Sequence, residues 1–197
     1  MASSQKQASL KPQDVVVALK IALAASSGSA GASRDGSSDV PAGAPSYAPS
    51  YAALAKSLFM SASEAHAAVQ RAITSRLLAQ SSAGLVANRA ALQEFLLHGF
   101  AYSFPGVEGP VTRGMPTGAA APHLSALFDQ TQSLAWVWPD AQGEVRGPSL
   151  CPLYPSVPAA CRLDENLYRM LSALDALRAG AAREREIAQR EVLRLLS

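Results

Sequence analysis

The sequence predicts a mainly α protein with a small β component, and three observations support this fold class. Apolar residues recur at helical spacing in several segments, beginning with Val15, Leu19 and Leu23. Alanine, which favours helix, contributes much of a hydrophobic share of 49%. Runs of β type are short and are bounded by Pro and Gly. The length of 197 residues suits one domain with an appendage, or two small domains.

Helices are expected in seven segments: 12–25, 50–58, 62–78, 88–99, 122–131, 164–178 and 181–196. Pro12 fits a first helical position, Asn88 fits an N-cap, and Gly99 fits the residue just after a helix. Gly180 separates the last two segments. Strong apolar periodicity and end signals therefore mark most of the chain as helical.

The remaining segments are predicted to be loops and short strands. Residues 1–11 are expected to form a flexible tail, and the Ser-, Gly- and Ala-rich residues 26–46 a flexible loop, because neither can bury much apolar surface. A β-hairpin is expected over 100–117 and a strand with a turn over 134–147. The proline-dense stretch 150–161 is expected to be extended.

The net charge of +2 does not describe a strongly basic protein. The charge is uneven, because residues 1–80 carry seven Lys and Arg against four Asp and Glu, whereas residues 81–197 carry ten against eleven. A mild positive bias in the first part permits contact with phosphates and does not establish it.

Motifs of catalysis or metal binding are not found. Two cysteines, Cys151 and Cys161, and three histidines show no metal-ligand spacing, and no nucleophile elbow or phosphate loop is present. We therefore expect no enzyme activity, no cofactor and no metal. The alternating Trp136 and Trp138 could line a ligand pocket or pack as an aromatic edge. No apolar run is long enough to span a bilayer, so a cytoplasmic protein without membrane contact is expected.

Residues 50–78 carry the pattern that bears on function. Apolar residues at i, i+3, i+4 and i+7 form one stripe, with the small Ala55 allowing a second helix to cross closely. Ser61 and Glu64 form the S-x-x-E capping box that starts this second helix. Its apolar side comprises Ala65, Val69, Ala72, Ile73 and Leu77, and its opposite side comprises Ser63, His66, Ala67, Gln70, Arg71 and Thr74.

The opposite side has the chemistry that reads base edges in a major groove. Gln70 can pair with adenine and Arg71 with guanine, and Ala67 can touch a thymine methyl. Ser63 and His66 can reach base edges or phosphates, and Lys56 and Arg76 would contact phosphates. Two capped amphipathic helices also occur in many all-α proteins, so a purely structural helix pair is the alternative.

The run SYAALAKSLFMSASEAHAAVQRAI resembles the helix-turn-helix of winged-helix transcriptional regulators of the broad MarR-like kind. It shares the phrase YxxLAxxLxxSxS at Tyr51, Leu54, Ala55, Leu58, Ser61 and Ser63. This sequence departs from the family at Phe59, where the family often has Gly near the turn. It also departs at Ala65, where the family has a β-branched residue. The resemblance covers residues 50–73 and implies a winged helix-turn-helix domain that binds double-stranded DNA.

A winged domain needs a β-hairpin beside the reading helix. The hairpin expected at 100–117, with Arg113 near its end, is one candidate for this wing, and residues 81–87 are the other because they directly follow the reading helix. Arg113 would either enter the minor groove or be a solvated loop arginine. On this basis residues 12–117 are interpreted as the DNA-binding domain.

The C-terminal region 118–197 contains two strong apolar stripes. The first comprises Leu167, Met170, Leu171, Leu174 and Leu177, and the second comprises Ile187, Val192, Leu195 and Leu196. Such stripes suit a homodimer interface or contact with another partner, and a dimer doubles the contacts on a palindromic site. The predicted function is sequence-specific DNA binding by a homodimeric transcriptional regulator, through helix 62–78. The alternative is a protein-interaction module, antitoxin-like or a scaffold subunit, in which the helix-turn-helix is structural.

Overall fold

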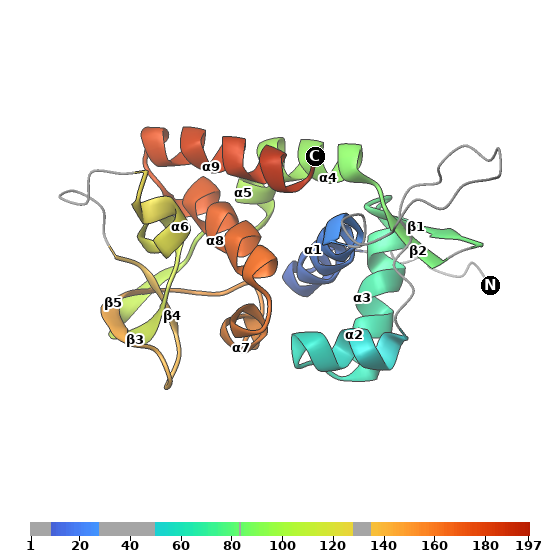
Figure 1. Cartoon of the computed structure of the whole chain (residues 1–197), viewed down its shortest axis with the longest axis horizontal. Coiled ribbons are helices and arrows are strands. Elements are labelled where there is room, and N and C mark those ends of the chain that lie inside the picture. The colour runs from blue at the N-terminus through green and yellow to red at the C-terminus, as the bar shows by residue number, and fades with distance from the viewer. Residues whose placement is uncertain (1–8, 28–49, 83, 128–134) are drawn as a thin grey trace, which may run out of the picture.

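The computed structural model describes residues 9–27, 50–82, 84–127 and 135–197, and it is mainly helical with two small sheets (Figure 1). Most of the expected flexible tail 1–11 and flexible loop 26–46 lies outside these residues. In Figure 1, one end of the molecule holds α2, α3, β1 and β2, and the other end holds a small barrel with α6. Within the described ranges, no helix has the length and apolar character that crossing a membrane requires.

Helix α1 (Pro12–Ser27) lies in the middle of the molecule, between α3 and α8 (Figure 1). It begins at Pro12, whose missing amide proton is tolerated in a first helical turn. The residues from Asp14 to Leu19 and from Ile21 to Leu23 are all buried, which is the pattern of a helix enclosed on every side. Lys20 interrupts this series and pairs with Asp164, at 2.6 Å between Nζ and Oδ2.

Helices α2 (Tyr51–Leu58) and α3 (Ala62–Thr74) are joined by a short turn. Ser50 caps α2 and Ser61 caps α3, and the predicted capping box of α3 is present. Phe59 adopts the left-handed conformation at φ 52°, which is the conformation that a Gly at this turn would favour. The expected helix over 62–78 is too long, because Arg76 at φ 60° breaks the helical path.

Strands β1 (Leu78–Ser81) and β2 (Gly84–Ala87) follow α3 directly and form an antiparallel hairpin, in which Leu78 lies opposite Ala87. Helix α4 (Arg89–His98) comes next, capped by Asn88 as predicted. The hairpin therefore lies directly between α3 and α4. It includes residues from the second of the two wing candidates, 81–87.

The expected β-hairpin over 100–117 is wrong. Residues Phe100–Ser103 form the short helix α5, in which the buried Phe100 packs edge-on against Phe95 and Phe104. The aromatic contacts with α4 favour a helical continuation over a strand. Only the second part is a strand, β3 (Glu108–Pro116), and its partners come from later in the chain.

Strand β3 pairs antiparallel with both β4 (Val137–Pro139) and β5 (Val145–Leu150), and the three close into a small barrel. A side chain at Gly114 would collide with the carbonyl of Trp138, so glycine permits this close strand approach. A 3₁₀ turn (Gly118–Ala120) and α6 (Pro122–Ser125) follow β3. Helix α6 is shorter than the expected 122–131, of which residues 128–131 lie outside the described part.

The stretch expected to be extended over 150–161 contains most of helix α7 (Val157–Arg162). Pro158 stands in its first turn, where a missing amide proton is harmless, so the proline density did not exclude a helix. Helices α8 (Glu165–Ala179) and α9 (Ala182–Leu195) then complete the chain, with the predicted break at Gly180.

One hydrophobic core joins the two ends of the molecule. It contains residues of α1, α2, α3 and α4 together with residues of β4, α7, α8 and α9. The first apolar stripe of the C-terminal region lies inside this core, because the side of α8 from Leu167 to Leu177 is buried. In the second stripe, Val192 and Leu196 are buried and Ile187 and Leu195 are half-buried. The chain itself covers the first stripe and part of the second, and the dimer interface expected from the sequence stays a prediction.

The buried Asp175 of α8 has its hydrogen-bond partners on α8 itself and at the barrel. The Asp175 carboxylate accepts hydrogen bonds from the Thr117 hydroxyl at 2.7 Å and the Trp138 indole at 2.6 Å, and it pairs with Arg178 at 2.8 Å. Burial raises the pKa of the Asp175 carboxyl, while its three donors act in the opposite direction. Trp138 is therefore a structural residue packed against α8, as in the aromatic-edge interpretation.

Candidate nucleic-acid interface

Helix α3 presents two sides of different chemistry. Its buried side consists of Ala65, Ala68, Val69 and Ala72. Its exposed side includes Ser63, His66, Gln70 and Thr74, with Ala67 half-buried between them. The exposure predicted for these four polar side chains is confirmed, and their contact with DNA stays a prediction.

The N-terminus of α3 is held by several hydrogen bonds around Glu64. The Ser61 hydroxyl accepts from the Glu64 amide at 3.1 Å, and the Glu64 carboxylate accepts from the Ser61 amide at 3.3 Å. The Tyr154 hydroxyl also donates to this carboxylate at 3.0 Å. These bonds, led by that of the Ser61 amide, lower the pKa of the Glu64 carboxyl, so the side chain is ionised at neutral pH.

The polar side chains along α3 are only lightly engaged by the protein. The His66 ring contacts the Tyr51 ring edge-on, with 4.9 Å between centroids. The Thr74 hydroxyl donates to the Gln70 carbonyl at 2.9 Å, and the Ser63 hydroxyl lies 3.0 Å from that of Ser61. His66 and Gln70 are exposed, so a ligand can reach their polar atoms.

Arg71 does not share this freedom, contrary to the expectation of a base-reading guanidinium. Its Nε and Nη2 donate to the two carboxylate oxygens of Asp14, at 2.8 and 2.6 Å. Asp14 is fully buried, and the Arg71 side chain is only 22% exposed. This hydrogen bonding raises the pKa of Arg71, which is charged in any case. The partner residue lies 57 positions away in the sequence, so helical periodicity could not have revealed it.

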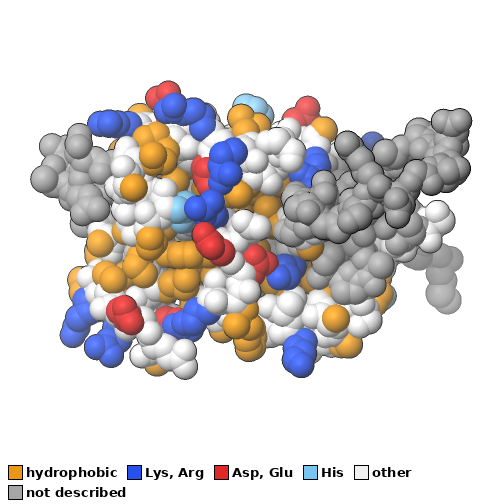
Figure 2. All heavy atoms as spheres, in the orientation of Figure 1, with side chains coloured by type: hydrophobic (Ala, Val, Ile, Leu, Met, Phe, Trp, Pro, Cys, Tyr) orange, Lys and Arg blue, Asp and Glu red, His pale blue; other side chains and the backbone are white. Residues whose placement is uncertain are grey.

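Of the basic residues expected to contact DNA outside the reading side of α3, two lie near α3 and one lies far from it. Lys56 on α2 and Arg76 at the end of α3 are exposed. Arg113 lies on β3, at the opposite end of the molecule from α3 (Figure 1), so it does not flank this helix. Its cross-strand neighbour is the equally exposed Arg146. Figure 2 shows Lys and Arg side chains spread over one face of the molecule without a single dense basic patch.

Sequence reasoning largely missed the β1–β2 hairpin beside α3. Gln80, Ser81 and Ser82 are exposed near its tip, and the Ser81 hydroxyl donates to the Gly84 carbonyl at 2.9 Å. The available signal was the sequence Ser-Ser-Ala-Gly between two apolar runs, which is typical of a turn. In the structure Gly84 has φ 128°, a conformation that favours glycine. Its short strands, LAQS and GLVA, contain few residues of high β propensity.

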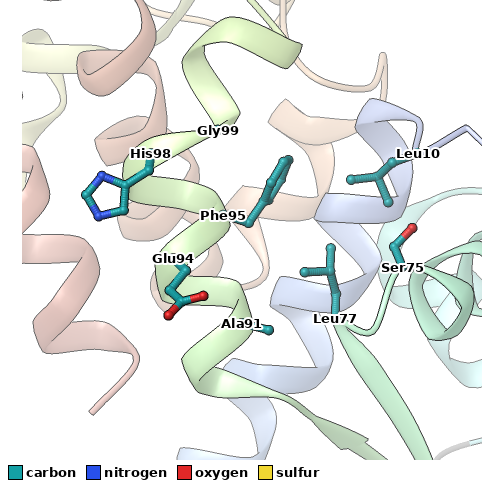
Figure 3. Close-up of a pocket in the computed structure, with 8 residues that line it drawn as sticks. All are labelled: Leu10, Ser75, Leu77, Ala91, Glu94, Phe95, His98 and Gly99. Carbon is teal, nitrogen blue, oxygen red and sulfur yellow. The ribbon is translucent and has the colours of Figure 1, made fainter.

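A groove lies between the start of α1, the end of α3 and helix α4 (Figure 3). Its volume is about 580 Å³, and its lining comprises Leu10, Ser75, Leu77, Ala91, Glu94, Phe95, His98 and Gly99. The lining of this groove is mainly apolar. Among the described side chains, no group of three His, Cys, Asp or Glu could hold a metal ion.

Comparisons of the chain with protein-family models, with curated proteins and with solved structures give no match.

Proposed function

We propose that this protein binds double-stranded DNA in a sequence-specific manner, with α3 in the major groove. The observation that carries the proposal is the exposed side of α3, on which Ser63, His66, Gln70 and Thr74 project from a helix whose other side is buried. Amide and imidazole groups at this spacing can hydrogen-bond to base edges. The short α2–α3 turn sets the second helix against the first, as in a helix-turn-helix.

The elements around α3 support a winged arrangement. Three helices, α1 to α3, precede an antiparallel hairpin that follows α3 without another element between them. In this proposal, β1–β2 is the wing, and its exposed Gln80, Ser81 and Ser82 lie near the DNA backbone. The resemblance of residues 50–73 to MarR-like regulators supports the same assignment.

Few cations are available for phosphates near α3. Lys11, Lys56 and Arg76 are exposed and, within the described part of the chain, form no ion pair. Lys20 and Arg71 are both engaged by carboxylates. With three contacting cations, the logarithm of affinity should fall with the logarithm of salt concentration at a slope of about −3 per chain. Binding should therefore depend only moderately on salt.

Selection from a random-sequence DNA library, followed by titration of the selected site, tests the proposal. The variant His66→Ala/Gln70→Ala should bind the selected site at least about 10-fold more weakly, since each lost base contact is worth about 1–3 kcal/mol. The matched variant His98→Ala/Gln189→Ala removes the same exposed residue types from α4 and α9 and should bind normally. Equal affinity of both variants would reject α3 as the reading helix.

The rival function is protein interaction through a structural helix-turn-helix, and the low cation density near α3 favours it. A chain of this kind would yield no enriched DNA sequence and no salt-dependent affinity. Homodimerisation on a palindromic site also stays a proposal. Since α8 buries its stripe, a dimer would use other surfaces, such as the half-buried Ile187 and Leu195 of α9, and light scattering with and without the selected DNA measures its formation.

A further inference from the structure

The side of α3 that packs on the protein core is formed mostly by small side chains, and Ile73 adds one larger, half-buried side chain. Its fully enclosed residues are three alanines and one valine: Ala65, Ala68, Ala72 and Val69. Helices normally fix their relative orientation by fitting ridges of side chains into grooves. Alanine side chains end at Cβ, so they form low ridges, and a small rotation of α3 about its axis changes little buried area.

Rotation of this size would matter for recognition. Side chains on a helix end about 5–6 Å from its axis. A rotation of about 30° would therefore move the end of the Gln70 side chain by about 3 Å, which exceeds the distance tolerance of a hydrogen bond. Base reading by α3 requires a stronger constraint than its alanine side provides.

The ion pair between Asp14 and Arg71 has the geometry of such a constraint. Two parallel hydrogen bonds join the guanidinium to the carboxylate, and a bidentate pair fixes direction as well as distance. The carboxylate also accepts from the Lys11 amide at 2.8 Å, so Asp14 itself is fixed in the first turn of α1. Burial of Asp14 makes Arg71 its necessary partner, because an unpaired charge would be costly there.

We infer that Asp14 and Arg71 are positioning residues that set the rotation of α3 about its axis, and with it the direction of His66 and Gln70. This inference rests on the proposed function for its consequence in DNA reading. The constraint itself is a property of the free protein. Arg71 acts through α3 and does not contact a base.

Spin-label distances test the constraint without DNA. Labels at Gln70→Cys and Gln189→Cys, in a chain with the exposed Cys151 replaced by Ser, report the rotation of α3 relative to α9. The variant Asp14→Asn/Arg71→Met removes both charges, so it leaves no buried unpaired charge and should fold. We expect its distance distribution to be at least about twice as wide as that of the parent, or its mean to shift by about 3 Å.

The matched control removes an ion pair elsewhere. Arg162 of α7 pairs with Asp140 beside the barrel, and Arg162→Met should leave the α3 distance unchanged. A distribution in Asp14→Asn/Arg71→Met identical to that of the parent would overturn the inference. This readout is valid even if the chain binds no DNA, so failure of the proposed function can be recognised separately.

DNA titration then distinguishes a positioning arginine from a reading arginine. If Arg71 positions α3, Asp14→Asn and Arg71→Lys should each reduce discrimination between selected and scrambled DNA by at least about 10-fold, which corresponds to about 1.4 kcal/mol. Affinity for scrambled DNA should change by less than about 2-fold. If Arg71 reads a base, Asp14→Asn would free it and preserve discrimination, and that result would contradict the inference.

Discussion

Helices α3 and α8 begin in the same way, but the protein covers them to different extents. Each has a side-chain N-cap, Ser61 for α3 and Asp164 for α8, and each carries an apolar stripe. Helix α8 is covered on all sides, since every residue from Leu171 to Leu177 is buried. Helix α3 is covered on one side only. Ser172, Asp175 and Arg178 of α8 hydrogen-bond within the protein, whereas several polar groups of α3 remain for a ligand.

The comparison shows that an apolar stripe does not reveal what will cover it. In α8 the stripe is covered by the chain itself, and the sequence could not distinguish this from a subunit interface. In α3 the informative residues are the polar ones opposite the stripe. The following predictions test the contrast between an internal helix and a projecting one.

The largest effect is expected in α8 at Asp175. Asp175→Ala would leave the nearly inaccessible Arg178 guanidinium without its carboxylate and would remove an acceptor from Thr117 and Trp138. The free energy of unfolding should fall by about 3–5 kcal/mol. Urea denaturation monitored by tryptophan fluorescence measures this change. A loss below 1 kcal/mol would mean that α8 is less enclosed than described.

The two N-caps should differ by a smaller amount. Asp164 accepts from the Leu167 amide at 3.0 Å and also pairs with Lys20 of α1. The hydroxyl of Ser61, in contrast, bonds to Ser63 and Glu64 in the first turn of its own helix. We expect Asp164→Ala to cost about 2 kcal/mol of unfolding free energy and Ser61→Ala about 1 kcal/mol. Parallel thermal and urea unfolding of the two variants provides the comparison, and the reverse order would contradict it.

The pH dependence at the start of α3 follows from Glu64. Its pKa in the folded protein is lowered, so its stabilising contribution is present above the unfolded value of about 4.3 and is lost as pH falls through the lower folded value. Glu64→Gln can still complete the capping box but does not titrate. The stability advantage of the parent chain over Glu64→Gln should therefore disappear between about pH 5 and pH 3. Unfolding curves across this range would show a constant difference if Glu64 were not responsible.

The smallest effect is expected at Arg113. This residue lies at the barrel end, opposite Arg146 and away from α3. Arg113→Ala removes a like-charge neighbour, so unfolding free energy should change by less than about 0.5 kcal/mol. Affinity for a selected DNA should stay within about 2-fold, as measured by fluorescence anisotropy. A large loss of affinity would require a second DNA contact at the barrel.

Local signals predicted the elements that depend on local causes. The capping box at Ser61 and Glu64, the cap at Asn88 and the break at Gly180 all lie where the sequence placed them. Distant contacts decided the rest. Helix α5 packs on α8, β3 pairs with strands beyond residue 130, and Arg71 pairs with Asp14. The exposed side of α3 could be predicted, but the engagement of one of its members could not.

The central place of α1 determines how the protein can be divided. Because α1 packs on α3 and also on α8, a shortened gene that ends near residue 117 would leave one flank of α1 in water. Transplanting the helix pair alone into another scaffold would likewise remove the carboxylate of Asp14 that holds Arg71. The α2–α3 end and the barrel end of the molecule must therefore be produced together for either to keep its shape.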